Sequence, residues 1–561
     1  MASRFWKGYL TTLLVGLSVS CAAIAQTPPP PPPPLGPPPV PPQNPQTEAK
    51  INLGKVLFWE EQLSVSGTVA CGTCHRPSDG GSDPRSAFAN AGSTHPGPDG
   101  VYNNGDDIQG SPGVPSHFAN GFYELSSNFG LNPQVGGRKS PSMINAAYSP
   151  ILFWDGRAGT SFTDPDTGQV LIPNGAALEN QALAPLLDVA EMSSMGAMVG
   201  DIAGRLGGAR PLALATEIPA ALGAWIADRG YPALFNEVFG SPEVTPARIA
   251  MAMASYQRSL FSNQAPIDAF FAGQPNVLTP QEAQGQQLFG ANDCRACHAG
   301  NRFTDENFRY IGVRPVPEDL GRFNQTANPG DRGAFKVPSL RNVELRAPYM
   351  HNGRFATLEE VVDFYDRGGD FNAPNKDPRV RPRGLTAQQK QALVAFLKRP
   401  LTDPRVGPES APFDRPTLYS ESDRVPQIIG SAVVGSGAIA PQIHAIEPPL
   451  LGNANFTVGV SRALGGAQAT LVVSHSDPGI QASVPTGDFA NIGGTLAGSG
   501  AGAGYASMQL DLGSDPGLIG QTLFGRVYID DPAAANGLAI TQAFQINVFG
   551  VSDELMSDGF E

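Results

Sequence analysis

Two short cysteine and histidine motifs carry the clearest chemical signal in the sequence. The segments CGTCH (residues 71–75) and CRACH (residues 294–298) each offer two thiols and, directly after them, an imidazole. This spacing suits covalent attachment of a haem through two thioether bonds, with the histidine as an axial iron ligand. A lone C-x-x-C could be a redox dithiol or half of a zinc site, but two copies followed by histidine predict two c-type haems. The residues predicted to hold haem are Cys71, Cys74, His75, Cys294, Cys297 and His298.

The first 25 residues have the pattern of a cleavable export signal. Arg4 and Lys7 precede an apolar run, and the segment 23–25 has the small-x-small pattern of a cleavage site. The apolar run is too short to span a bilayer. Cys21 lies in this signal, so no cysteine is left for a disulfide bond. We therefore expect a periplasmic or secreted protein.

Composition divides the rest of the chain into three kinds of segment. Consecutive prolines predict an extended polyproline II spacer. Capping boxes that begin at Thr279, Thr357 and Thr386 favour helices in the middle of the chain. Towards the C-terminus, short β-forming runs alternate with turn residues, so we expect a mainly α protein with a small all-β, sandwich-like domain at its end. The predicted segments are a signal peptide (1–25), a linker (26–46), an N-terminal haem domain (47–240), a C-terminal haem domain (241–407), a second linker (408–425) and a β-rich domain (426–561).

The charge of the chain excludes one class of partner. The chain has 37 Lys and Arg against 51 Asp and Glu, which gives a net charge of −14. Nucleic-acid binding by counterion release requires a basic surface, so we expect no nucleic acid as a partner. No later segment approaches the ~20 uninterrupted apolar residues of a membrane helix, so we expect no membrane span.

The two haem motifs stand in a longer pattern that resembles the dihaem cytochrome c peroxidases and their MauG-like relatives. The similarity covers about residues 47–405. It includes LGKVLF at 53–58, FWDGRA at 153–158, KVPSLRN at 336–342 and APYMHNG at 347–353. The resemblance implies one haem c in each of two cytochrome c-like domains. It also implies that peroxide is reduced at the N-terminal haem with electrons relayed through the C-terminal haem.

The resemblance implies catalytic roles for three side chains. Glu191 matches the family's distal glutamate, and Gln181 falls at the family spacing before it. A carboxylate beside an open iron position can move a proton between the two peroxide oxygens. Trp154 matches the tryptophan between the haems, where a large π-system can relay an electron. The alternatives are an ordinary surface carboxylate for Glu191 and a buried core residue for Trp154.

The far side of the second haem differs from that of the reductively activated peroxidases. Where those enzymes have a methionine ligand, this sequence has Tyr365, as in MauG. The resemblance implies that a tyrosinate binds this iron and lowers its reduction potential relative to a thioether ligand. Met350 is the rival ligand. The predicted iron ligands are therefore His75, His298 and Tyr365.

The resemblance supports a bound calcium ion less well. The family holds Ca²⁺ between the haems with an asparagine side chain and two carbonyls, whose positions fall on Lys139, Arg346 and Pro348. A lysine offers no amide oxygen to the ion, so only carbonyls could hold calcium there. The acidic loop 95–107 is a second candidate, although solvated turns are the commoner use of such loops. His95 has no clean match to the histidine that blocks resting peroxidases, so we expect an open first haem.

The leading hypothesis is a dihaem c-type peroxidase that reduces hydrogen peroxide with electrons from a small redox protein or an organic donor. Two alternatives stay open, a secreted dihaem oxygenase with an apolar distal pocket and a non-catalytic electron carrier with two six-coordinate irons. Asn292 stands where MauG carries a surface tryptophan that oxidises a protein substrate, so we expect no maturation of a protein-derived quinone. We expect residues 426–561 to fold independently and to be dispensable for haem binding and for the reaction with peroxide.

Overall fold

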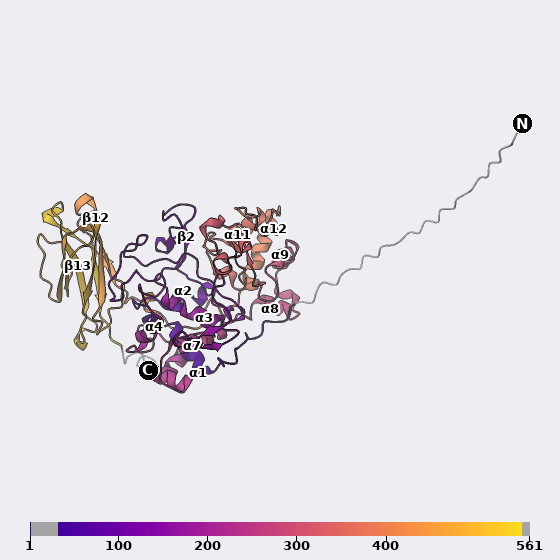
Figure 1. The fold of residues 1–561 in the computed structure, drawn as a ribbon, viewed down its shortest axis with the longest axis horizontal. Coiled ribbons are helices and arrows are strands. Elements are labelled where there is room, and N and C mark those ends of the chain that lie inside the picture. The colour runs from indigo at the N-terminus through magenta and orange to yellow at the C-terminus, as the bar shows by residue number, and fades with distance from the viewer. Residues whose placement is uncertain (2–31, 552–561) are drawn as a thin grey trace.

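The computed structural model describes Met1 and residues 32–551 of the chain. Two helical regions, each built around one haem motif, lie beside each other, and a β-domain stands on the far side of the first (Figure 1). The predicted export signal and residues 26–31 lie outside the described residues, apart from Met1. In the part that the structure describes, no helix is long and apolar enough to cross a membrane.

The first helical region packs around two helices that cross at a glycine. α1 (Glu48–Phe58) lies against α7 (Pro246–Ser259). A Cβ atom on Gly54 would come within 2.0 Å of the Ala252 carbonyl oxygen, so only glycine permits this crossing. α3 (Ala177–Leu183) packs on α7 as well. The other α-helices of this region are α2 (Cys71–Cys74), α4 (Val199–Leu206), α5 (Ala220–Ile226) and α6 (Tyr231–Phe239).

The second helical region repeats this arrangement. α9 (Pro280–Ala291) crosses α12 (Ala387–Leu397) at Gly285, whose Cβ atom would lie 1.9 Å from the Ala392 carbonyl oxygen. α11 (Leu358–Asp366) packs on α12. The three capping boxes predicted from the sequence begin α9, α11 and α12. The haem-bearing part also contains two short helices, α8 (Pro266–Phe271) and α10 (Phe323–Thr326). It contains three strand pairs as well: β1 (Thr94–His95) with β2 (Ile108–Gln109), β3 (Phe162–Thr163) with β4 (Val170–Ile172) and β5 (Phe308–Arg309) with β6 (Phe335–Lys336).

The packing of α7 bears on the boundary between the helical regions. The sequence predicts this boundary after residue 240, whereas α7 packs in the first core. Leu260 is the last residue of that core before Ala265 begins the second. The packing of α7 therefore favours a boundary between these two residues, because the glycine crossing ties α7 to α1.

The two segments predicted as linkers also contact the body of the protein. In residues 408–425, Phe413 and Leu418 are fully buried in the core of the first helical region. In the proline-rich segment, Asn44 is buried and its Nδ2 donates to Glu179 Oε1 at 2.8 Å. The described part of the first linker is therefore attached to the surface rather than acting as a free spacer.

The β-domain (residues 426–551 as described) consists of two antiparallel sheets around its own core. One sheet has the order β11-β10-β13-β15-β7, with β14 beside β13, and the other has the order β12-β9-β8. Apolar residues from both sheets, such as Val458, Leu471 and Val527, are buried between them, which agrees with the predicted sandwich. The strands are β7 (Gln427–Ile429), β8 (Gln442–His444), β9 (Phe456–Gly465), β10 (Gln468–Ser474), β11 (Ala490–Thr495), β12 (Gly500–Leu510), β13 (Thr522–Asp530), β14 (Leu538–Ile540) and β15 (Ala543–Asn547). The chain thus combines helical haem regions, which contain long irregular segments, with a β-rich C-terminal domain.

Candidate haem sites

A cavity of about 580 Å³ lies beside the first cysteine and histidine motif. Cys71, Cys74 and His75 line it. His75 Nδ1 lies 3.2 Å from the Gly81 carbonyl oxygen, to which it can donate. This hydrogen bond leaves Nε2 as the nitrogen that can bind a metal, which is the usual arrangement of histidine ligands.

Glu191 lines the same cavity from a turn, not from the surface of a helix. Burial, together with the nearby charge of Asp188, raises the pKa of its carboxyl group to about 7. Gln181, on α3, lines the cavity with Glu191. A carboxyl group that titrates near neutral pH can both accept and release a proton. The structure therefore brings the predicted acid–base group to the first haem motif.

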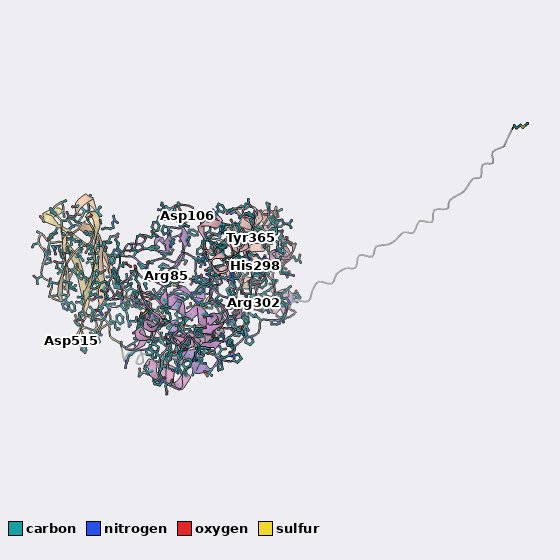
Figure 2. All side chains as sticks on the ribbon, viewed as in Figure 1. Arg85, Asp106, His298, Arg302, Tyr365 and Asp515 are labelled. Carbon is teal, nitrogen blue, oxygen red and sulfur yellow. The ribbon has the colours of Figure 1, made fainter. Side chains whose placement is uncertain are left out.

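A second cavity, of about 230 Å³, lies beside the second motif. Cys294, Cys297 and His298 line it. His298 Nδ1 lies 3.0 Å from the Phe303 carbonyl oxygen, which repeats the arrangement at the first motif. Tyr365 lines this cavity from α11, and Figure 2 shows Tyr365 close to His298 in the second helical region.

Two side chains that could bind iron line the second cavity, Tyr365 and Met350. Burial raises the pKa of the Tyr365 phenol above its ordinary value, so the phenol is neutral unless a cation faces it. A ferric ion is such a cation. Met350 has a backbone φ of +75°, in the left-handed region. Tyr365 stays the predicted ligand, and Met350 stays its rival.

Trp154 borders both cavities. Its indole Nε1 donates to the Lys139 carbonyl oxygen at 2.8 Å. The Lys336 backbone N–H donates to the Trp154 carbonyl oxygen at 2.9 Å. These two bonds hold the tryptophan between the two cavities.

Two cations border both cavities, the buried Lys139 and the half-buried Arg346. Burial lowers the pKa of the Arg346 guanidinium to about 10, and its Nε has no hydrogen-bond partner among the described residues. Burial lowers the pKa of Lys139 to about 8, and its ammonium donates to Ser82 Oγ at 2.5 Å. A buried cation is costly unless an anion pairs with it. The carboxylates of a haem would supply that anion, so the thiols, the imidazoles and these cations together fit a haem in each cavity.

The acidic loop 95–107, a candidate calcium site in the sequence, is built from turns that its own carboxylates stabilise. In the described ranges, no cluster of three or more His, Cys, Asp or Glu side chains is arranged to hold a metal. In the loop 95–107, carboxylates serve the loop's own turns, since the Asn103 backbone N–H donates to Asp107 Oδ2 at 2.8 Å. His95 does not line the first cavity, and its ring packs against Phe129.

Comparison with known proteins identifies the family. A family model described as di-haem cytochrome c peroxidase matches residues 48–276, and a cytochrome c model matches residues 282–399. The methylamine utilization protein MauG of Methylorubrum extorquens is 32% identical over 369 residues, which cover 65% of this chain and 81% of that protein. The chain belongs to the dihaem cytochrome c peroxidase (MauG) family. It is therefore an oxidoreductase that holds two covalently bound haem c groups.

The chain is also similar to a protein named as a peroxidase and to a solved MauG-like structure. The cytochrome-c peroxidase IdrP1 of Denitromonas iodatirespirans is 29% identical over 441 residues, which cover 71% of this chain and 96% of that protein. The crystal structure of a MauG-like protein associated with microbial copper homeostasis is 26% identical to this chain, with a TM-score of 0.48. The match covers 69% of this chain and 97% of that protein's chain. Both family models end before the β-domain.

Sequence reasoning missed two features of these sites. The sequence indicates Lys139 and Arg346 only as positions of a calcium site, whereas the structure shows them as cations that border both cavities. The segment 111–138 consists of turns, bends and isolated bridges, and several of its residues line the first cavity. Gly113 in this segment approaches the Glu191 turn closely, and an isolated glycine gives little signal of such contact in a loop already rich in glycine.

Proposed function

We propose that this protein reduces hydrogen peroxide at its N-terminal haem, with electrons that pass through its C-terminal haem. The observation that carries this proposal is Glu191, a carboxyl group with a pKa raised to about 7 on the wall of the first cavity. An electron carrier needs no acid–base group at this place, and an oxygenase for an apolar substrate favours an apolar pocket. Membership of the peroxidase family supports the same choice.

The reduction of one peroxide molecule consumes two electrons and two protons and yields two water molecules. When bound, the haem supplies the electron-transfer chemistry at the O–O bond. Glu191 accepts a proton from the peroxide oxygen that approaches the metal and returns it to the departing oxygen. The Gln181 amide, on the same wall, orients the peroxide by hydrogen bonding.

The remaining predicted residues serve the supply of electrons. We assign Trp154 as the relay between the sites, because it borders both cavities. Tyr365 would hold the iron of the C-terminal haem together with His298, because both line the second cavity. A small redox protein or an organic donor would supply the electrons. The export signal predicted from the sequence places this reaction in the periplasm or outside the cell.

The variant Glu191→Gln tests the proposal. It should keep both haems and slow the reaction with peroxide by roughly 10²- to 10⁴-fold, because the amide cannot accept the proton. Stopped-flow optical spectroscopy of the diferric protein after mixing with peroxide measures this rate. Glu243→Gln is the matched control, because Glu243 is an exposed carboxylate of the same region that does not line the cavity.

Two outcomes would contradict the assignment. An unchanged rate in Glu191→Gln would remove Glu191 from the mechanism. A wild-type protein that leaves peroxide unreacted but consumes O₂ with an organic substrate would instead support the oxygenase alternative.

A further inference from the structure

The β-domain contacts the tip of a long loop, residues 112–135, which belongs to the first haem region. Ser507 Oγ, on β12, accepts from the Tyr123 backbone N–H at 3.1 Å and lies 3.2 Å from the Tyr123 carbonyl oxygen, to which it can donate. Side chains thus recognise the loop backbone at this point. Two more bonds join the domains, from Thr457 Oγ1 to the Gly121 carbonyl oxygen at 3.2 Å and from Gln509 Nε2 to the Asn120 carbonyl oxygen at 3.0 Å.

A buried polar cluster lies in the same interface. Glu447 of the β-domain is buried, with Oε1 3.8 Å from His117 Nε2 and Oε2 accepting from the Thr457 backbone N–H at 2.9 Å. The His117 ring packs edge-on against Tyr123, with ring centroids 4.9 Å apart. Burial raises the pKa of Glu447 and of Tyr123. Among the described residues, His117 Nε2 and Tyr123 Oη have no hydrogen-bond partner, so this cluster contributes packing rather than hydrogen bonds to the interface. The hydrogen bonds that hold the loop tip are those of its backbone to the β-domain side chains described above.

The base of the same loop forms part of the wall around Glu191. A Cβ atom on Gly113 would lie 1.9 Å from the Ala190 carbonyl oxygen and 2.7 Å from that of Glu191, so the two backbones are in direct contact. Gln134 Nε2 donates to the Val189 carbonyl oxygen at 2.7 Å. A shift of the loop base therefore has to move the turn that carries Glu191.

The loop also contacts the haem attachment site. Arg85 Nη2 donates to the Pro112 carbonyl oxygen at 2.6 Å and lies 3.2 Å from Cys74 Sγ. Gly113 lines the first cavity, whereas none of residues 112–135 lines the second. A change in the loop should therefore affect the first haem and leave the second unchanged.

We propose that the β-domain is a positioning element of the first haem site, which fixes the loop 112–135 and through it the place of Glu191. The inference deepens the proposed function and rests on it only for the role of Glu191. It makes Ser507 and Glu447 positioning residues, because they hold the loop and do not touch the cavity. The proposal predicts that loss of the β-domain disturbs the first haem site, whereas the sequence alone predicts that the domain is dispensable.

A pair of glycine variants separates this contact from general damage to the β-domain. A Cβ atom on Gly459, in β9, would lie 3.0 Å from both Tyr123 Cδ2 and Leu131 Cδ1, so Gly459→Val pushes on the loop. A Cβ atom on Gly493, in β11, would meet no atom within 4 Å, so Gly493→Val is the matched control. Both changes suit an extended strand, where valine is favoured.

The readout is cyanide binding to the purified diferric holoprotein, followed by optical titration, together with electron paramagnetic resonance of both haems. Gly459→Val should raise the dissociation constant for cyanide at the first haem by about 5-fold or more, the lower end of ordinary coupling between sites. The ferric signal of the first haem should shift, and that of the second should not. Gly493→Val should match the wild type in both measurements.

Ser507→Ala provides a second test, in which the substituted side chain is smaller rather than larger. It removes the bonds to the Tyr123 backbone and should shift cyanide binding in the same direction as Gly459→Val. Its control is Ser461→Ala, because Ser461 Oγ bonds only within the β-domain, to His444 Nε2 at 2.8 Å.

Unchanged cyanide binding and resonance signals in Ser507→Ala and Gly459→Val would overturn the proposal. Equal shifts in the two control variants would overturn it too, because the effect would then follow β-domain stability and not the contact. Cyanide binding needs no peroxide turnover. If the protein proved to have no peroxidase activity, cyanide binding could therefore still be measured, and the two proposals can fail separately.

Discussion

In both haem regions two helices cross at a glycine, Gly54 in the first and Gly285 in the second, and a histidine bonded to a backbone carbonyl follows the cysteine pair. The opposite walls of the two cavities differ. The first cavity, of about 580 Å³, has Glu191 and Gln181, whereas the second, of about 230 Å³, has Tyr365 and Met350. The shared frame carries the haem attachment residues, whereas the other wall residues come from different elements, a turn and α3 in the first region and α11 in the second.

The structural element that carries each of these wall residues suits the role proposed for it. Tyr365 lies within α11, which packs on α12, so its position is fixed by a packed helix. Glu191 lies in a turn that contacts the loop 112–135, whose tip is held by the β-domain. A fixed axial ligand needs only a rigid helix, whereas a proton-transfer group has to be placed relative to a small substrate. The difference teaches that the first site depends on more of the chain than the second.

Removing one cysteine pair at a time is expected to have the largest effect. Cys71→Ala with Cys74→Ala, and Cys294→Ala with Cys297→Ala, should each lower covalent haem from two groups per chain to about one, because each pair supplies both thioether bonds of one haem. A pyridine haemochrome assay measures this count. The first variant should lose cyanide binding at the open haem and the second should retain it. A wild-type protein with a single covalent haem would contradict the whole comparison.

The sequence predicted the attachment side of both sites well, because that chemistry is local. The thiols and the imidazole lie within five residues, and the capping boxes at Thr279, Thr357 and Thr386 lie beside the helices that they begin. Glu191 is far from residues 71–75 in the chain, so no local rule joins them, and only the family resemblance indicated the pairing. The resemblance ends before the β-domain, which is why its contact with Tyr123 could not be predicted.

Replacing the predicted ligands of the second haem should have the next largest effect. Tyr365→Phe should raise the reduction potential of this haem by roughly 0.1 V or more, within the ~0.8 V range that axial ligands span, because an anionic oxygen stabilises ferric iron. Met350→Leu is the matched control and should leave the potential unchanged. Spectroelectrochemistry and electron paramagnetic resonance of both variants measure the outcome. A low-spin ferric signal that survives Tyr365→Phe and changes in Met350→Leu would assign the methionine instead.

The pH dependence of the first site should show the smallest effect. Burial raises the pKa of Glu191 from its ordinary 4.5 to about 7. Since the proton acceptor is the deprotonated form, the rate of reaction with peroxide should rise about tenfold from pH 6 to pH 8, with a midpoint near 7. Asp188→Asn should move this midpoint to lower pH, because the charge of Asp188 contributes to the rise. The profile should lose its midpoint in Glu191→Gln.

The raised pKa of Glu191 also makes the free energy of unfolding depend on pH. The direction of this dependence is opposite to that of an ordinary paired carboxylate, whose pKa is lowered in the folded protein. Because its pKa is higher in the folded than in the unfolded protein, the folded state binds more protons between pH 4.5 and about 7. The free energy of unfolding therefore falls as pH rises through this window, and the loss is complete above the folded pKa. Glu191→Gln, which removes the titrating group, should gain thermal stability relative to the wild type at pH 8 but not at pH 4.5. Melting temperatures of both holoproteins at the two pH values measure this difference, and an equal offset at both would show that Glu191 is not held in a desolvated site.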